Sequence, residues 1–222
     1  SLAEMPINIA LFPILVFIPK FYTGEMGVPL ALAANIILAV RIFDVFTDPV
    51  VGYINDRTNT KWGRRRPWIA ISTPLLMVSI YMLFIPPEGA GALHLFLWMF
   101  LLSIGTTMLI IPYYAWGAEL SPDYNERSRI TGWRSISGVV GSLSAQLIPT
   151  IALVFFGLGG STNVLYIVGI ASVIIMPICV FLTVLKVPES KDYVQSNISP
   201  IKGFKIMLEN SPFKRLIMAF MF

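Results

Sequence analysis

Long stretches without a charged residue are the feature that most constrains this chain. Such stretches include residues 67–87, 89–118 and 135–185, and a helix needs about 20 mainly apolar residues to cross a bilayer. The last stretch is interrupted by the loop-like segment 157–163, which separates two spans. Only 13% of the residues are charged, against about 25% in soluble domains. We therefore predict an all-α membrane protein with six spans, at about residues 5–22, 29–55, 67–86, 92–118, 129–156 and 162–185.

The positions of the basic residues predict how the chain is oriented. Of the 16 lysines and arginines, all but Lys20, Arg41 and Arg134 follow the second, fourth or sixth span, and the opposite connections contain none. Basic connections stay on the cytoplasmic side of a membrane. We expect a multi-pass protein of the cell membrane with a cytoplasmic N-terminus. The net charge of +4 then reflects orientation, and we predict the lipid bilayer as a partner and no nucleic acid.

Composition divides the chain into three parts. Residues 1–185 form the predicted transmembrane bundle. Residues 186–212 are mainly polar and predict a cytoplasmic linker with one interfacial helix at 201–208. Residues 213–222 begin another apolar run, which predicts the start of a seventh helix. We expect a fragment of a longer protein whose other six-helix bundle is missing; a natural six-span protein with an apolar tail is the alternative.

Two acids in the second span are the main candidates for function. A carboxylate inside a bilayer is costly, so it indicates a functional site by default. Asp44 and Asp48 are one helical turn apart on one face, so both can reach one ion. The Thr47 hydroxyl would add a further oxygen ligand for a hard cation such as Na⁺. The alternative is structural: Arg41 neutralises Asp44 and Asp48 extends to the membrane surface.

Other polar residues give weaker signals. Arg134, about one turn into the fifth span, suits a solute oxygen or an acid on another helix; the alternative is an interfacial arginine. Thr107 and Tyr114 are seven residues apart and share a face of the fourth span. His94, at the outer end of that span, is expected to be a solvated loop residue. No phosphate-binding loop, Ser/His/Asp set or metal-ligand spacing is present, so we predict no enzyme and no cofactor beyond a coupling ion.

Two sequence blocks resemble a known family. Residues 41–68 read RIFDVFTDPVVGYINDRTNTKWGRRRPW, and residues 111–134 read IPYYAWGAELSPDYNERSRITGWR. The first block is similar to the lengthened loop between helices two and three of the glycoside-pentoside-hexuronide:cation symporters, the melibiose permease-like family of the major facilitator superfamily. The second block resembles the connection between helices four and five in that family. The resemblance implies twelve helices in two bundles, of which this chain is the N-terminal bundle, the middle linker and the start of helix seven.

The resemblance also implies roles for individual residues. It assigns the cation, Na⁺ or H⁺, to a set on helices two and four: Asp44, Thr47, Asp48 and Thr107. It assigns the solute to positions on helices one, four and five: Asn8, Ile110, Tyr114 and Arg134. It assigns a gating latch between the bundles to the cytoplasmic loop: Asp56, Arg57, Arg64 and Arg65. Asn8 and Ile110 replace two acids that bind galactosides in the family, which makes galactoside binding doubtful.

These patterns together predict a secondary symporter that couples Na⁺ or H⁺ to the movement of a sugar, glycoside or uronide-like solute by alternating access. Na⁺ is favoured over H⁺ because Thr47 and Thr107 add neutral oxygens that a proton does not need. Because the sequence shows no acid opposite Arg134, an anionic solute such as a uronide is favoured over a neutral galactoside. The alternatives are an amphiphilic, lysolipid-like solute, and a non-transporting membrane scaffold or receptor on the same fold.

Overall fold

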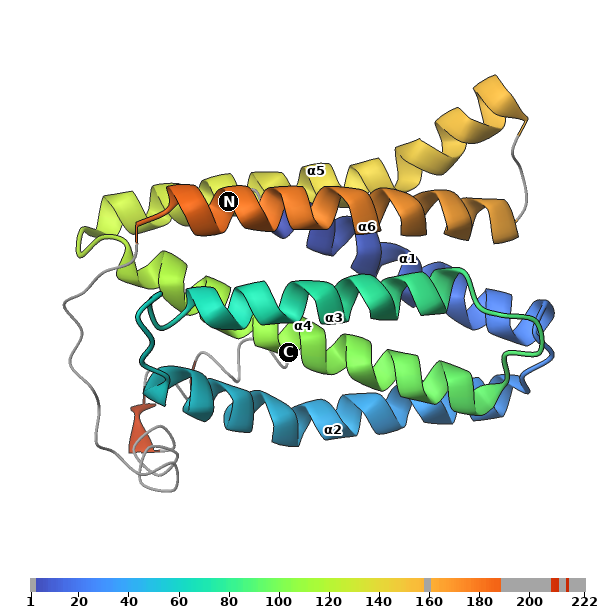
Figure 1. Cartoon of the computed structure of the whole chain (residues 1–222), viewed down its shortest axis with the longest axis horizontal. Coiled ribbons are helices and arrows are strands. Elements are labelled where there is room, and N and C mark those ends of the chain that lie inside the picture. Colours follow the sequence, from blue (N-terminus) through green and yellow to red (C-terminus); the bar gives the residue numbers. More distant parts are fainter. Residues whose placement is uncertain (1–2, 158–160, 189–208, 212–214, 216–222) are drawn as a thin grey trace. The chain divides into compact units, whose positions relative to one another are not determined.

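The computed structural model describes residues 3–157, 161–188, 209–211 and 215, and within them the chain folds into six α-helices (Figure 1). Each helix is long and apolar enough to cross a membrane, which confirms a multi-pass membrane protein. Most boundaries lie within two residues of the predicted ones. The predicted linker helix at 201–208 lies outside the described residues, as does nearly all of the predicted start of a seventh helix. The helices are α1 (Glu4–Gly24), α2 (Leu30–Arg57), α3 (Arg66–Phe84), α4 (Ala92–Glu119), α5 (Tyr124–Phe156) and α6 (Ser161–Lys186).

The start of α5 is the boundary that differs most from the prediction. The helix begins at Tyr124, five residues before the predicted start, because Asp123 caps it. One carboxylate oxygen of Asp123, Oδ1, accepts hydrogen bonds from the backbone N–H groups of Asn125 (2.7 Å) and Glu126 (3.0 Å). An acid in this position satisfies N–H groups that have no partner inside the helix. The first turn of α5 therefore stands outside the apolar segment.

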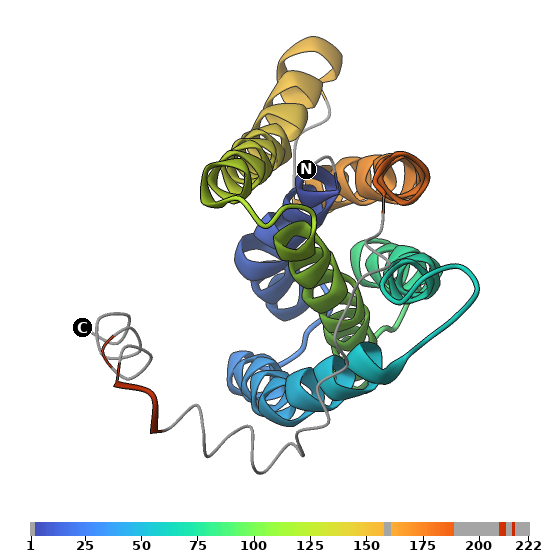
Figure 2. The same cartoon turned by 90° about the vertical axis from the view of Figure 1, so that its left-hand side faces the viewer.

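Inside the bundle, α1 packs mainly against α5 and α6, whereas α4 packs mainly against α2 and α3, and α3 also packs against α6. Figure 2 views the helices end-on and shows α1 between α5 and α4. The contact of α1 with α5 is close because α5 presents glycines there. A Cβ atom on Gly141 would lie 2.3 Å from the carbonyl oxygen of Met5, and one on Gly138 would lie 3.2 Å from Cγ of Glu4. Small residues on a membrane helix permit this approach.

The expectation for His94 is wrong. The residue lies in the first turn of α4, where its Nε2 is 2.9 Å from the carbonyl oxygen of Met82. Its ring also stacks on Tyr22 at a centroid distance of 6.4 Å. Carbonyls in the last turn of a helix have no partner within that helix, and the start of α4 lies close enough to the end of α3 for the imidazole to supply one. His94 therefore joins α1, α3 and α4 at the end opposite the α2–α3 connection.

We expect Gly141→Ala to destabilise the bundle, because the new methyl group meets the Met5 backbone and α1 must move away from α5. Overpacking of this kind costs roughly 1–3 kcal/mol. The measurement is the thermal unfolding midpoint of the purified protein in detergent. Gly132→Ala is the matched control, since it makes the same change in the same helix at a site with nothing within 4 Å. Equal midpoints for the two variants would contradict the close α1–α5 contact.

Candidate functional site

Two carboxylates of α2 face two hydroxyl groups of α4. Asp48 Oδ1 accepts a 2.7 Å hydrogen bond from the Thr107 hydroxyl, and Asp44 Oδ1 accepts one from the Ser103 hydroxyl. Asp44 and Asp48 are four residues apart, and so are Ser103 and Thr107. One turn of α2 is therefore matched to one turn of α4. Ser103 was missed by the sequence analysis, although its spacing from Thr107 repeats that of the two acids.

Asp44 also has a cationic partner in its own helix. Arg41 Nη1 lies 3.3 Å from Asp44 Oδ2, and the Arg41 side chain is 61% exposed while that of Asp44 is 17% exposed. This contact agrees with the first part of the structural alternative, in which Arg41 neutralises Asp44. The second part does not hold for the arrangement seen here, because Asp48 is directed to Thr107 on a neighbouring helix. The acid pair thus has one oxygen near a guanidinium group and two bound by neutral hydroxyls.

A cavity of about 290 Å³ lies between α1, α2 and α4. Carboxylate and hydroxyl oxygens are the ligands that hard cations prefer, so its polar side has the chemistry of a Na⁺ site or of a protonated carboxylate. Thr47 does not line the cavity: its hydroxyl is 3.5 Å from the carbonyl oxygen of Asp44 in its own helix. The other side of the cavity is apolar. The polar lining residues are Arg41, Asp44, Asp48, Ser103, Thr106 and Thr107.

The four predicted solute positions lie in different surroundings. Ile110 lines the α1–α2–α4 cavity. Tyr114, one turn further along α4, is 40% exposed, and the guanidinium carbon of Arg134 lies 4.1 Å from the centroid of its ring. Asn8 does not line the cavity, because its Nδ2 donates to the carbonyl oxygen of Glu4 (2.9 Å) and its side chain lies against α5. The structure therefore brings Tyr114 and Arg134 together, whereas Asn8 lies against α5 and does not line the cavity.

An acid that the sequence analysis missed lies beside this pair. Glu4, in the first turn of α1, accepts a 2.9 Å hydrogen bond from the Tyr114 hydroxyl through Oε1. The Tyr114 hydroxyl thus contacts the Glu4 carboxylate, and the Arg134 guanidinium group lies over the Tyr114 ring. Glu4 lies one turn before Asn8 on α1, and this spacing is the only sign of its role in the sequence. Arg134 does not stand in surroundings free of acids, which removes the reason given for favouring an anionic solute.

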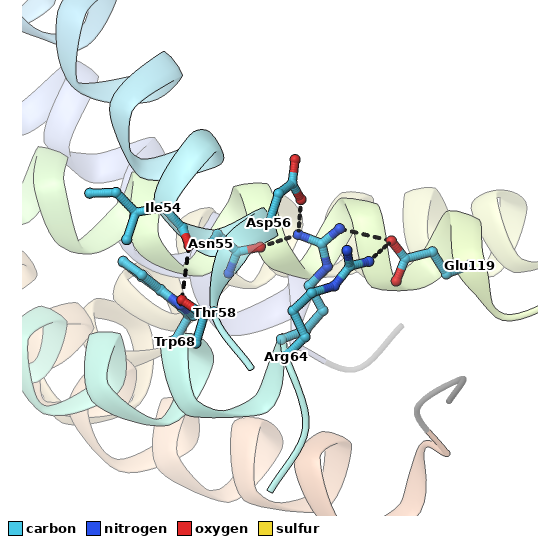
Figure 3. A network of polar contacts seen from close by, with 8 residues as sticks. Ile54, Asn55, Asp56, Thr58, Arg64, Trp68 and Glu119 are labelled. Atoms are coloured by element: carbon cyan, nitrogen blue, oxygen red, sulfur yellow. Dashed lines mark hydrogen bonds and ion pairs between the residues drawn. The ribbon is translucent and has the colours of Figure 1, made fainter. Parts of the chain in front are cut away.

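The predicted latch residues gather at the end of the bundle where α2 meets α3 (Figure 3). Glu119 is the last residue of α4, and its Oε1 forms ion pairs with Nη2 of Arg64 (2.5 Å) and Nη2 of Arg65 (2.8 Å). Arg65 also lies 2.7 Å from Asp56 and donates to the Asn55 side chain. The network therefore joins the end of α2, the start of α3 and the end of α4. Glu119 and Asn55 were missed because nothing local marks them as partners.

The remaining latch residue and a nearby tryptophan complete this end of the bundle. Arg57 lies with its guanidinium carbon 4.1 Å from the centroid of the Tyr53 ring. The Thr58 hydroxyl donates to the carbonyl oxygen of Ile54 (2.9 Å) and accepts from the indole N–H of Trp68 (2.9 Å) (Figure 3). These contacts close the turn between α2 and α3 within one bundle. A contact from these residues to a second bundle stays a prediction.

Comparison with known proteins agrees with this geometry. Six helices long enough to cross a membrane, with two carboxylates in one of them, define a multi-pass membrane protein. A family model described as "MFS/sugar transport protein" matches residues 1–222. The chain therefore belongs to the sugar transport family of the major facilitator superfamily. Its expected resemblance to melibiose permease-like symporters and its fold as a six-helix bundle of that type are confirmed.

Several curated transporters are similar over most of the chain. The isoprimeverose transporter of Lactiplantibacillus pentosus is 29% identical over 96% of this chain and 46% of its own length. A putative glycoside/cation symporter of Escherichia coli, YagG, is 28% identical over 90% of the chain and 44% of its own. The sodium-dependent lysophosphatidylcholine symporter 1 of the mouse is 27% identical over 93% and 46%. The chain spans less than half the length of each of these relatives.

We expect Arg65→Gln to destabilise the bundle, because Asn55 loses its cationic partner and Glu119 keeps only Arg64, in a place where Arg65 is only 3% exposed. Leaving a buried hydrogen-bonding group without its partner costs about 1–3 kcal/mol. Arg57→Gln is the control, since Arg57 is exposed and stacks on a ring of its own helix. Thermal unfolding of the purified protein in detergent measures both. Similar midpoints for the two variants would show that the network contributes little.

Proposed function

We propose that this chain forms one half of a cation-coupled symporter, in which Asp44 and Asp48 bind the coupling ion and a sugar, glycoside or uronide-like solute binds next to it. The observation that carries the proposal is the pairing of these two acids with Ser103 and Thr107 beside a cavity between membrane helices. Acids at such a depth are retained where they have a functional partner. The names of the bacterial sugar and glycoside transporters among the relatives support the solute class.

The ligand set favours Na⁺ over H⁺ as the coupling ion. A proton needs only one carboxylate, whereas Na⁺ needs several oxygen ligands, which two acids and two hydroxyls can supply. Arg41 at 3.3 Å provides a positive charge for Asp44 before a cation arrives. An entering Na⁺ then competes with the guanidinium group, which is largely exposed on the surface of the bundle and is free to move away from Asp44. The acid pair is therefore never left without a counter-charge.

Transport follows from alternating access between two bundles. Cation and solute each raise the affinity of the other by the same factor, because coupling between binding sites is reciprocal. The second bundle would close the cavity that α1, α2 and α4 line, and rocking of the bundles would open it to each side in turn. The basic connections place the α2–α3 end in the cytoplasm of the cell in this proposal.

A second candidate solute is an amphiphile with a lysolipid-like tail. The cavity favours it in one respect: nine of its fifteen lining residues are apolar, so one wall accepts a hydrocarbon chain. One relative is named a lysophosphatidylcholine symporter. A scaffold or receptor without transport would have no use for the acid pair, so that alternative has no observation in its favour.

We expect Asp44→Asn and Asp48→Asn each to lower Na⁺-stimulated uptake by about ten-fold or more, since a charged ligand of the ion is lost in each case. Solute binding should weaken and not disappear, because the solute contacts remain. Uptake of a labelled glycoside into proteoliposomes, with and without a Na⁺ gradient, measures the effect. Glu88→Gln in the exposed α3–α4 connection removes a charge away from the cavity and should behave as the wild type. Normal Na⁺-dependent uptake by both aspartate variants would rule out the site.

Neutralising the latch should affect the rate and leave ion affinity unchanged. Arg64→Gln removes one of the two cations on Glu119 without touching the cavity, so we expect slower turnover with little change in the Na⁺ concentration that gives half-maximal stabilisation. Initial uptake rates give the turnover, and thermal shift against Na⁺ gives the affinity. A large loss of Na⁺ affinity at normal turnover would contradict a gating role.

A further inference from the structure

We infer that Glu4 is a solute-binding residue and that it forms, with Arg134 across Tyr114, a charge-balanced subsite for an uncharged, hydroxyl-bearing group such as a neutral glycoside. The inference rests on the proposed transport function and specifies which solute class that function serves. It concerns a different part of the bundle from the acid pair on α2.

The first argument is the position of Glu4 between three helices. Its Oε1 accepts from Tyr114 of α4 at 2.9 Å, and Cγ lies where a Cβ atom on Gly138 of α5 would be 3.2 Å away. Gly138 is one turn after Arg134 on α5, so the glycine leaves room for an acid beside that arginine. The guanidinium carbon of Arg134 is 4.1 Å from the centre of the Tyr114 ring. One tyrosine therefore separates the two charges.

The second argument is that polar atoms here are buried with their hydrogen-bonding capacity unused. Among the described residues, Glu4 Oε2 is buried and has no hydrogen-bond partner, and the Tyr113 hydroxyl is buried close to the backbone of Glu4. Tyr113 is only 6% exposed, and it lines a small cavity of about 40 Å³ together with Arg134. Buried polar groups in this state cost free energy unless a ligand or water completes them. The cluster thus offers one acceptor, one hydroxyl and one guanidinium group to a bound molecule.

The third argument is that Glu4 and Tyr114 lie on the same faces of α1 and α4 as residues that line the cavity with the acid pair. Leu11 of α1 and Ile110 of α4 both line that cavity. Glu4 lies seven residues before Leu11, and Tyr114 lies four residues after Ile110, so each follows the cavity-lining face of its helix. The offset along α1 is roughly 10 Å. A solute that reaches the subsite therefore lies within one sugar unit or two of the cation.

The chemistry of these groups favours a neutral polyol. Glu4 Oε2 needs a hydrogen-bond donor, which a sugar hydroxyl supplies and a carboxylate or phosphate does not. An anion would be attracted to Arg134 and repelled by Glu4, so the pair gives it little net preference. A phosphocholine headgroup balances both charges, but its quaternary ammonium has no N–H to donate. Sugar hydroxyls both donate and accept, and the tyrosine rings provide faces for the apolar side of the ring.

The test compares matched ligands on the purified full-length protein in Na⁺. The probes are the methyl glycosides of glucose, galactose and xylose, the methyl glucuronide and galacturonide, and phosphocholine, with binding measured by calorimetry. We expect the wild type to prefer at least one neutral glycoside over its uronide. Glu4→Gln keeps an acceptor for Tyr114, and it should shift the neutral-to-uronide affinity ratio toward the uronide by about ten-fold or more. Arg134→Gln should shift the ratio in the opposite direction.

A double variant and a control separate the possible outcomes. Glu4→Gln combined with Arg134→Gln restores charge balance and should return the ratio toward that of the wild type, even if all ligands bind more weakly. Glu88→Gln should leave the ratio unchanged. An unchanged ratio in Glu4→Gln overturns the inference, as does a wild type that binds only uronides, only phosphocholine or none of the probes. Stabilisation of the wild type by Na⁺, lost in Asp48→Asn, tests the proposed function separately.

Discussion

The constraint on which this structure depends is that a charged group in a membrane needs a polar partner within the protein. Asp48 is bound by Thr107, and Asp44 by Ser103 and Arg41. Water in a bilayer core is too scarce to satisfy such groups. The two acids therefore fix the register of α2 against α4, since a shift of one residue along either helix would turn them away from the hydroxyls. Glu119 has the corresponding role at the end of the bundle, where it pairs with Arg64 and Arg65, the two residues just before α3.

Features that arise from local sequence could be predicted. Apolar length gave the six spans, and the four-residue spacing placed Asp44 and Asp48 on one face. The start of α5 was missed because Glu126 and Arg127 resemble a loop when only charge is considered. The cap at Asp123 shows that a membrane helix can begin in water if its first N–H groups have an acceptor.

Features that arise from contacts between distant segments could not be predicted. Glu4 and Tyr114 are 110 residues apart, and Ser103 and Asp44 are 59 residues apart. Their pairing depends on which helices are neighbours and on how closely α1 approaches α5. Gly138 and Gly141 permit that close approach. Arg134 in the sequence has no visible acidic partner for this reason. Ser103 is an intermediate case, because its spacing from Thr107 could have been compared with that of the acids.

The position of both proposed sites along α4 bears on how coupling would work. Ser103, Thr107 and Tyr114 occur at four- and seven-residue intervals, so they follow one face of one helix over about three turns. A stiff helix holds the cation ligands and the tyrosine at a fixed separation, so movement within this bundle would alter both sites together and favour neither. In the proposed mechanism, the two ligands therefore communicate through the closure of a second bundle over the shared face. Each ligand stabilises the closed arrangement, so the free energy that closure costs is smaller when the second ligand binds.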